Sequence, residues 1–464
     1  LPTPRRTTTA LDTALFSVTS MFHPGQVALD IFGDEQTSGD RRRCQPKDGE
    51  DSSLLDMHRR VAVIYTVIYG GLKGMPYCLE ILEPMMEQAG HPLSLVLDGD
   101  PSVDTPWGLA KAYVDETNAY LDEHDGWNAD GSMGRAFNRV PFSDYAITDS
   151  AGNSWSPYVP KNTPYHFERE NHWQPLMESD GLGYISTQEH VTPQIGVTAR
   201  FFGFRTPEEE ATFAARELKS PRYRYGTIVN DVIEESRLAA TDDLKQTAIE
   251  FFDNKLLSLV PLKVAYFMSL TSSVTALDFY RVTVQIQLAI YNGVVLSWRE
   301  KIRHDRPRPP SVVKHELGDT LVEAYAGPGQ GVQTMKASEW EPFIRTMPHS
   351  EFPSASSCIC QLYAEQLALF FEEGDIISPP LRFGPLANNV TFEFGSWSEI
   401  SDMCGDSRVW GGMHFADAVP AGVELCGGNL LAESISSSIG ALLDGDTSAA
   451  VFVRNPGELM VRPL

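Results

Sequence analysis

The stretch KIRHDRPRP, residues 301–309, follows the pattern K-x6-R-P and is the first of three polar motifs in the last third of the chain. The second motif is PSAS, residues 353–356, and the third is SRVWGGMH, residues 407–414. Together they offer three fixed cations, serine hydroxyls and the start of a helix. Such groups suit a tetrahedral oxyanion better than a neutral metabolite or a bare metal ion. The sequence therefore predicts an oxyanion site assembled from three separate segments.

The spacing of apolar residues predicts an all-α protein made of helical bundles, with the oxyanion site inside the C-terminal bundle. Thr105-Pro106 and Thr206-Pro207-Glu208-Glu209 are helix-start signals, because threonine caps free amides and proline suits the first helical position. Long patterned segments follow near 224–256, 259–273 and 275–304. We find no strand alternation of convincing length.

The chain divides into three parts by the character of its sequence. Residues 1–53 are rich in Thr, Pro, Gly and charge, and we expect an irregular segment that wraps the surface. Residues 54–255 form an N-terminal helical part, interrupted over 123–192 by a long loop region rich in Gly, Asn, Pro and aromatic residues. Residues 256–464 form the C-terminal helical bundle that contains the oxyanion site.

Composition narrows the classes of partner. The 464 residues are 42% hydrophobic and 21% charged, which is enough apolar material for a sizeable core. The formal charge of −25 argues against nucleic acid or an anionic membrane as a partner, since both bind clustered basic surface. The most apolar stretch, 256–280, is interrupted by Pro261, Lys263 and Asp278 and is typical of a buried helix pair, not of a membrane span. Homo-oligomerisation stays open.

The six cysteines show no zinc-type pairing, and their even number permits up to three disulfides. We expect an oxidising location, such as secretion, on this basis. Cys358 and Cys360 lie two residues apart on an expected helix and should point apart, so they should not bond to each other. Cys404 with Cys426 and Cys44 with Cys78 are the more plausible pairs. The alternative is six buried free thiols.

The three motifs resemble those of the vanadium-dependent haloperoxidases and, through them, of the acid phosphatase superfamily. The first and third motifs match the family pattern in full. The sequence that follows Arg308 and the sequence around His414 resemble those of haloperoxidases rather than those of phosphatases. The middle motif departs from the family's P-S-G-H. Here Ala355 stands in place of the glycine and Ser356 in place of the catalytic histidine.

The resemblance implies vanadate as the cofactor, hydrogen peroxide, a halide ion and an organic halogen acceptor as partners, and oxidation of the halide to a hypohalous-acid equivalent. The residues it assigns to cofactor binding are Lys301, Arg308, Ser354, Ala355 through its amide, Arg408 and His414. The metal itself is bonded by His414. The catalytic positions are His414, Ser354, Ser356 and Lys301. Ser354 is also expected to cap the helix that follows it.

Ser356 raises the question of what supplies the proton that the family's histidine would handle. A serine hydroxyl does not titrate near neutrality, so acid/base assistance should weaken. Either the enzyme oxidises only the easier halides, bromide or iodide rather than chloride, or another group acts instead. Candidate groups are His349, His304 and Asp305.

Two further features surround the motifs. The family often carries an aspartate four residues after the metal-binding histidine, whereas here Asp417 lies three residues after His414. Either Asp417 orients the ring from a different angle or another acceptor replaces it. Trp298, Phe352 and Trp410 are aromatic residues that could border a halide, although core packing is the better interpretation of each.

Two other functions stay open. An acid phosphatase on the same scaffold would use His414 as a nucleophile, and Ser356 weakens its leaving-group protonation too. A catalytically weakened oxyanion- or vanadate-binding protein would also keep the cations and lose the acid/base histidine. The haloperoxidase-like sequence around the first and third motifs favours the haloperoxidase function over these two alternatives.

Overall fold

The computed structural model describes residues 105–124, 158–179, 183–191, 203–269, 274–371 and 394–444, with short stretches at 62–63, 66–67, 69, 147–148, 154–155, 193, 195, 201, 390 and 392. The segment expected over 1–53 and the expected pair Cys44–Cys78 lie outside these residues. The division into three parts therefore stays a prediction.

The described part of the chain is all-α, as predicted. Its α-helices are α6 (Pro106–His124), α9 (Pro207–Ala214), α10 (Tyr225–Ala239), α11 (Asp243–Asp253), α12 (Lys255–Ser269), α13 (Ala276–His304), α14 (Pro309–Leu317), α15 (Ala355–Phe370), α16 (Trp397–Trp410), α17 (Ala418–Cys426) and α18 (Leu430–Leu443). A short 3₁₀ helix, η4, covers Ala337–Glu339. None of the helices in the described ranges is long and apolar enough to cross a membrane.

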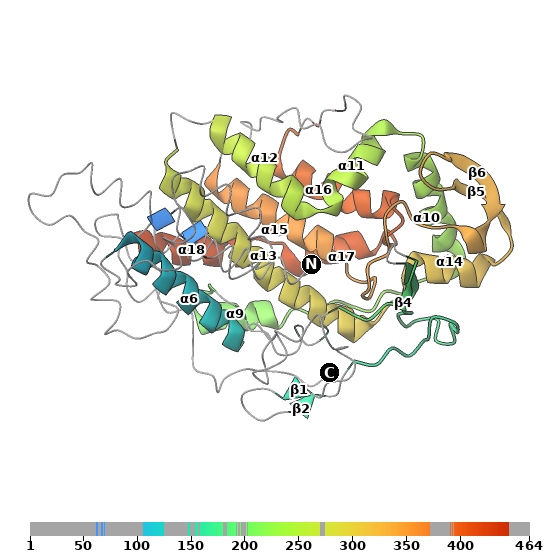
Figure 1. The fold of residues 1–464 in the computed structure, drawn as a ribbon, viewed down its shortest axis with the longest axis horizontal. Helices are drawn as coiled ribbons and strands as arrows, with labels where there is room; N and C mark the ends of the chain where they lie inside the picture. The colour runs from blue at the N-terminus through green and yellow to red at the C-terminus, as the bar shows by residue number, and fades with distance from the viewer. Residues whose placement is uncertain are drawn as a thin grey trace, which may run out of the picture.

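Helix α15 is the centre of the C-terminal bundle (Figure 1). It packs against α13, α16, α17 and α18, and its residues are buried along most of their length. The 29-residue helix α13 runs diagonally across the molecule beside it, and its residues from 282 to 298 are buried all around. This packing brings the starts of α14 and α15 and the end of α16, which carry the three motifs, towards one another.

The predicted helix starts are confirmed. Thr105 Oγ1 accepts from the Gly108 amide at 3.0 Å, and Thr206 Oγ1 accepts from the Glu209 amide at 3.2 Å. Glu209 reaches back to the amide of Arg205 at 3.2 Å rather than to that of the cap itself. These contacts are local, so the sequence alone is enough to predict them.

The expectation of no convincing strands was wrong for one hairpin. Strands β5 (Leu321–Tyr325) and β6 (Val332–Lys336) pair antiparallel over five residues each. A glycine-rich turn joins them, in which Gly327, Gly329 and Gly331 have positive φ. One face of the hairpin packs on the core through Val322, Ala324 and Met335, while the other face is mostly exposed. The strands are only five residues long, so this alternation is too short for a pattern search to find. Two shorter pairs are β1 (Ile147–Thr148) with β2 (Ser154–Trp155) and β3 (Met177–Ser179) with β4 (Ile185–Thr187).

Two disulfides fasten α15 to its neighbours. Cys358 bonds Cys426 of α17, and Cys360 bonds Cys404 of α16. Cys358 and Cys360 therefore do point apart, as predicted. The expected pair Cys404–Cys426 was wrong, as was the alternative of free thiols for these four residues. The reason is tertiary: α15 lies between α16 and α17, so its two cysteines, about 200° apart around the helix, each meet a different neighbour.

Replacing Cys358 and Cys426 together with alanine should lower the free energy of unfolding by about 2–5 kcal/mol, because this bond closes a loop with a sequence separation of 68 residues. The paired Cys360→Ala, Cys404→Ala variant, with a separation of 44 residues, should lose slightly less. Urea unfolding followed by circular dichroism measures both. Midpoints equal to that of the native chain in both variants would contradict these crosslinks.

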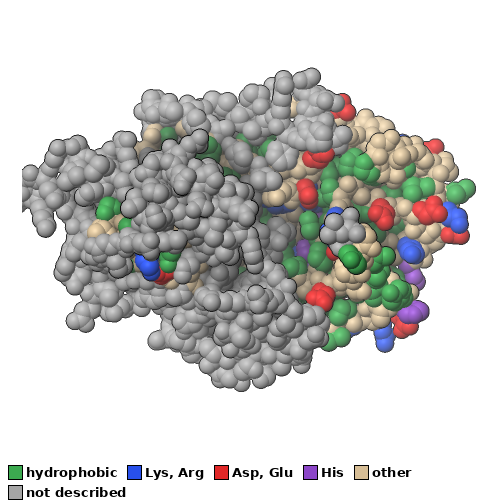
Figure 2. Space-filling model, viewed as in Figure 1, with side chains coloured by type: hydrophobic (Ala, Val, Ile, Leu, Met, Phe, Trp, Pro, Cys, Tyr) green, Lys and Arg blue, Asp and Glu red, His purple; other side chains and the backbone are tan. Residues whose placement is uncertain are grey.

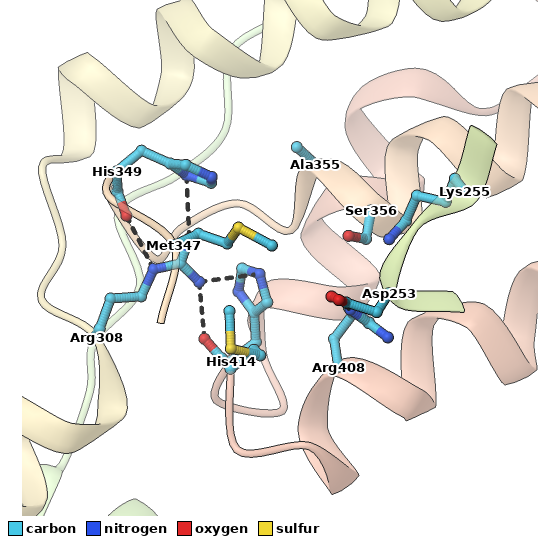
Figure 3. A pocket seen from close by; sticks show the side chains of 10 residues that line it. Asp253, Lys255, Arg308, Met347, His349, Ala355, Ser356, Arg408 and His414 are labelled. Carbon is cyan, nitrogen blue, oxygen red and sulfur yellow. Dashed lines mark hydrogen bonds and ion pairs between the residues drawn. The ribbon is translucent and has the colours of Figure 1, made fainter. Parts of the chain in front are cut away.

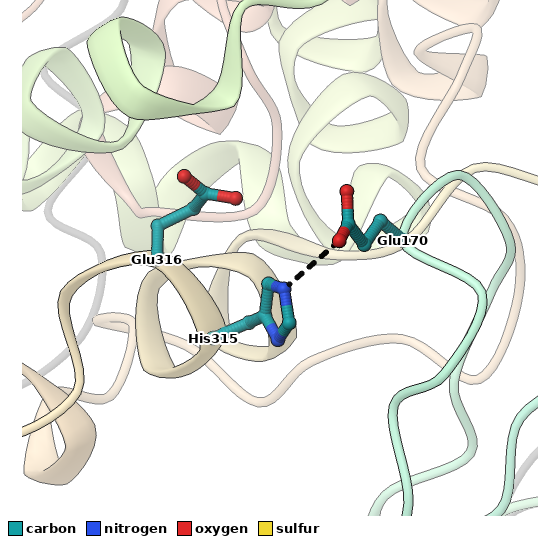
Figure 4. Close-up of side chains that lie close together, drawn as sticks. All are labelled: Glu170, His315 and Glu316. Carbon is teal, nitrogen blue, oxygen red and sulfur yellow. Dashed lines mark hydrogen bonds and ion pairs between the residues drawn. The ribbon is translucent and has the colours of Figure 1, made fainter.

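The loop that precedes β3 docks on the ends of α13 and α14. The Tyr158 hydroxyl donates to Asp305 Oδ1 at 2.7 Å, and the Trp173 amide donates to the Asp305 carbonyl at 2.7 Å. Further along, Glu170 Oε1 lies 3.3 Å from Nε2 of His315 on α14 (Figure 4). These contacts hold the loop over the side of the bundle where the motifs meet.

The described surface mixes charges of both signs. On the face shown in Figure 2, acidic, basic and histidine side chains lie side by side over the described residues, without a continuous basic patch there.

Candidate active site

A pocket opens where the three motifs meet (Figure 3). Its wall comes from the junction of α11 and α12, the starts of α14 and α15, the end of α16 and two loops. The residues that line it are Asp253, Lys255, Arg308, Met347, His349, Ala355, Ser356, Arg408, Met413 and His414. The pocket therefore combines side chains from all three motifs with four residues that lie outside them, Asp253, Lys255, Met347 and His349.

Arg308 is a buried cation whose hydrogen-bonding partners are all neutral. Its Nε donates to the His349 carbonyl at 2.9 Å and its Nη1 to the Met413 carbonyl at 2.8 Å. Its other contacts are Nη1 to His414 Nε2 at 3.2 Å and Nη2 to His349 Nδ1 at 3.0 Å. Burial lowers the pKa of Arg308 to about 10, with the charge of Glu351 opposing the shift. A guanidinium held in this way lacks a bonded anion, which a ligand could supply.

Arg408 is the second guanidinium of the pocket and lies at the end of α16. Its Nη2 donates to the Ile249 carbonyl at 3.0 Å, and its Nη1 lies 3.4 Å from the Asp253 carboxylate. Burial lowers its pKa to about 10, and Asp253 opposes this shift only in part. The Asp253 side chain is 38% exposed, so water screens it and the pair only partly neutralises the cation.

The His414 ring is held as one neutral tautomer. Its Nδ1 lies 3.0 Å from Glu351 Oε1, which can only accept when ionised, while its Nε2 lies 3.2 Å from an Arg308 nitrogen, which can only donate. The proton therefore belongs on Nδ1, and Nε2 presents its lone pair. Burial lowers the pKa of His414 well below its usual value, and the charges of Arg308, Lys301 and Arg408 lower it further.

Glu351 is the acceptor that orients this histidine. Its second oxygen accepts from the Tyr223 hydroxyl at 2.9 Å, and Oε1 also accepts from the Phe415 amide at 3.1 Å. Burial raises the pKa of Glu351 to about 7, although Arg308 and the Tyr223 hydrogen bond lower it. Asp417 is exposed and does not take this role. Of the two alternatives for the ring, the replacement acceptor is confirmed.

Two of the predicted cofactor-binding residues, Lys301 and Ser354, lie behind the pocket wall. Lys301 Nζ donates to the carbonyls of Ser350 at 2.8 Å, Glu351 at 3.2 Å and Pro353 at 2.5 Å. Ser354 is the N-cap of α15, as predicted, and its Oγ accepts from the amide and hydroxyl of Ser357 at 3.2 and 2.8 Å. Neither side chain is among those that line the pocket. Their roles in anion binding stay predictions.

Ala355 and Ser356 place the start of α15 directly on the pocket. Both are buried and both line it. As the first two residues of the helix, their amides have no carbonyl of the same helix to bond, and they lie at the positive end of its dipole. Ser356 and Lys255 both line the pocket (Figure 3). The predicted helix N-terminus is therefore part of the site.

Of the three candidate acid/base groups, only His349 lines the pocket. Its Nδ1 lies 3.0 Å from Arg308 Nη2 and 3.3 Å from the Ser350 carbonyl. Because a guanidinium only donates, Nδ1 accepts and the proton lies on Nε2, a buried atom without a partner among the described residues. Burial, followed by the charges of Lys301 and Arg308, lowers the pKa of His349 well below its usual value.

The remaining candidates have structural roles. His304 lies 3.1 Å from the Ser220 hydroxyl, and Asp305 holds Tyr158 and His172, all away from the pocket lining. The three aromatic residues do not line it either. Trp298 donates to the Val191 carbonyl at 2.9 Å and packs 5.0 Å from the His349 ring, Phe352 belongs to a core cluster, and Trp410 lies under Lys245 at 4.9 Å. Core packing was the better interpretation for all three, since Trp410 also packs against a core cluster.

Comparison with known proteins identifies the fold. Residues 281–439 match the family model of the VCPO second helical-bundle domain. The chain is similar in structure to an apo-type bacterial vanadium-dependent chloroperoxidase, with a TM-score of 0.76 and 20% identity over 95% of this chain and 94% of that one. The fold is that of the vanadium haloperoxidases.

Two further solved structures are also similar in fold to this chain. A holo-type bacterial vanadium-dependent chloroperoxidase gives a TM-score of 0.75 at 20% identity, covering 96% of this chain and 93% of that chain. A bacterial vanadium-dependent iodoperoxidase gives 0.57 at 15% identity, covering 94% and 91%. A search of curated protein sequences gave no match.

Within this haloperoxidase fold, three ionisable residues of the site, Glu351, Asp253 and Lys255, were missed from the sequence, as was the lining residue Met347. Glu351 could have been found as the one carboxylate between His349 and the PSAS motif. Asp253 and Lys255 gave no signal, because they precede the first motif by almost 50 residues and belong to an ordinary helix junction.

Proposed function

We propose that this protein is a vanadium-dependent haloperoxidase that uses hydrogen peroxide to oxidise a halide. The observation that carries the proposal is His414. His414 lines a buried pocket, its Nδ1 proton is held by Glu351, and its Nε2 accepts from Arg308, which is bonded only to neutral groups. A neutral imidazole beside one guanidinium without a bonded anion, Arg308, and one only partly neutralised by Asp253, Arg408, suits a metal oxyanion that needs both a nitrogen ligand and charge neutralisation.

The groups present fit vanadate. Arg308 and Arg408 would each grip oxygens of the anion, the amides of Ala355 and Ser356 would donate at the helix end, and His414 would bond the metal. Lys301 would hold the 350–353 segment, and so the start of α15, through its three carbonyl contacts. When bound, vanadate supplies a Lewis acid that makes peroxide electrophilic without a change in metal oxidation state.

His349 takes over part of the task of the missing histidine in this proposal. Its Nε2–H is the donor available to an oxygen in the pocket, while Arg308 holds Nδ1. The lowered pKa of His349 makes it a hydrogen-bond donor rather than a strong proton source near neutrality, and the Ser356 hydroxyl cannot replace one. We therefore expect bromide or iodide, which are easier to oxidise, to be better substrates than chloride.

The remaining features of the proposal follow from the same site. An organic molecule accepts the halogen, and hydrogen peroxide and halide are the small substrates. Two buried disulfides support an oxidising location such as secretion, since such bonds persist there. A homo-oligomer remains open to measurement by light scattering.

The function is tested by halide oxidation with purified protein, orthovanadate and hydrogen peroxide, comparing iodide, bromide and chloride. We expect vanadate-dependent turnover in the order iodide, bromide, chloride, with inhibition by phosphate. Hydrolysis of phosphate esters without halide oxidation would identify the acid phosphatase alternative. Tight vanadate binding without either activity would identify the catalytically weakened binding protein.

Glu351→Gln should weaken orthovanadate binding by roughly tenfold to a hundredfold, the usual effect of losing a charged group that orients a metal ligand. Inorganic phosphate, which forms no bond to the imidazole, should bind as before or more tightly, because a nearby negative charge is removed. Calorimetric titration of both anions measures the difference. Glu365→Gln, another buried carboxylate that lies away from the pocket, is the control. Equal losses for both anions would contradict an orienting role.

A further inference from the structure

The pocket wall carries oxidisable sulfur in the side chains of two methionines. Met347 lines the pocket (Figure 3), and so does Met413. Met413 is 2% exposed, whereas Met347 is only half-buried. Of the described residues that line the pocket, only Met347 and Asp253 are not buried. Met347 is therefore a thioether that combines contact with the pocket and access to solvent.

The loop that carries Met347 is held on both sides of this residue. The Gln188 side-chain amide donates to the Thr346 carbonyl at 2.9 Å, and the Val191 amide donates to the Pro348 carbonyl at 2.9 Å. The two contacts come from the segment that follows β4, which lies far from residue 347 in the sequence. They fix the backbone on either side of Met347, and so keep its thioether at the pocket wall.

A methionine in this place meets the oxidant that the proposed function produces. Its sulfur is soft and polarisable, and oxidation converts it to a sulfoxide. The sulfur attacks the halogen of a hypohalous acid and displaces hydroxide, and water then replaces the halide on sulfur. The products are the sulfoxide, a halide ion and a proton. Sulfur loses a pair of electrons and the halogen gains it, so the step needs no other oxidant.

Met347 should react before Met413. Oxidation adds a polar oxygen atom, which in the closely packed surroundings of Met413 needs both space and a hydrogen-bond donor. At the half-buried Met347, water can solvate the new oxygen. A sulfoxide there also changes the pocket, because its oxygen is an acceptor that competes with an oxyanion for the guanidinium groups of the wall.

We propose that Met347 is a site of self-modification, at which hypohalous acid formed in the pocket oxidises the thioether to the sulfoxide and so reduces further turnover. This inference rests on the proposed function, because that function supplies the oxidant. It assigns a role to a residue that belongs to none of the three motifs.

Peptide mapping by mass spectrometry tests the site directly. The native chain turning over with orthovanadate, hydrogen peroxide and bromide is compared with the native chain that receives hypobromous acid as a reagent, without orthovanadate. Met177, which is 42% exposed and lies outside the pocket lining, reports on oxidant in bulk solution. The ratio of Met347 sulfoxide to Met177 sulfoxide should be higher during turnover by on the order of tenfold or more, because an oxidant formed beside a group acts at a high effective concentration. Omission of bromide should abolish this excess.

Met347→Leu provides a second measurement, since leucine has a similar volume and no sulfur. The rate of bromide oxidation is followed over many turnovers and expressed relative to the initial rate of the same protein. Met347→Leu should retain a larger fraction of its initial rate than the native chain. Met177→Leu is the matched control and should lose activity as the native chain does. Thermal unfolding confirms that both variants are folded.

The outcomes separate this inference from the proposed function. Bromide oxidation by the native chain without an excess of Met347 sulfoxide over the reagent experiment would overturn the self-modification and leave the haloperoxidase standing. A folded, active Met347→Leu variant that loses activity as fast as the native chain would do the same. Absence of halide oxidation in the native chain would overturn the proposed function, and the self-modification with it.

Discussion

Replacing His414 with alanine should abolish vanadate-dependent halide oxidation, with a loss of roughly a thousandfold or more, because a metal ligand contributes several kcal/mol. The variant removes the Nε2 lone pair beside Arg308 and leaves the cations of the pocket in place. Phosphate, held by charge alone, should still bind. Initial rates of iodide oxidation at saturating orthovanadate, with titration of phosphate, measure the two effects.

The control for this variant is His315→Ala, which removes an imidazole from the exposed face of α14, outside the pocket lining. It should oxidise halide at the native rate. Turnover that persists in His414→Ala and still depends on vanadate would show that the metal is bonded elsewhere. Lost phosphate binding in the same variant would instead indicate that the pocket had collapsed.

Replacing Gly422 with alanine should displace the start of α15 and damage the site from a distance. A Cβ at Gly422 would lie 2.2 Å from the Ser354 carbonyl oxygen and 3.1 Å from the Ser357 side chain. The first contact is to backbone, which cannot turn away, and the Ser354 amide is itself bonded to the Ala418 carbonyl at 2.9 Å. Helices α15 and α17 must therefore separate, at a cost of about 1–3 kcal/mol or more.

The expected result is a lower unfolding midpoint together with weaker binding of orthovanadate and phosphate, measured by urea unfolding and calorimetry. Gly440→Ala in α18 is the matched control, since its Cβ meets only the end of the Arg281 side chain at 3.8 Å. Alanine there should stabilise the protein by about 0.5–1 kcal/mol, as expected for glycine in a helix interior. Native-like stability and affinity in Gly422→Ala would show that the close approach is unimportant.

Predictions from the sequence were confirmed where the predicted contact joins residues only a few positions apart. The caps at Thr105, Thr206 and Ser354 depend on a side chain and an amide three positions later, so the sequence predicts them directly. The divergence of Cys358 and Cys360 follows from helix geometry in the same way. The spacing of apolar residues was also enough to predict an all-α fold, and side chains of all three motifs do meet at one pocket.

The sequence by itself determined which segments become helices and which motif residues could serve an oxyanion, because both depend on near neighbours and on residue type. Tertiary structure alone decided which side chains, far apart in the sequence, contact one another. Glu351 meets His414 across 63 residues, Cys358 meets Cys426 across 68, and Lys255 enters the pocket while Lys301 turns to carbonyls of the next segment. Such choices depend on how helices pack, since packing sets which side chains share a buried space and which polar groups must be satisfied there.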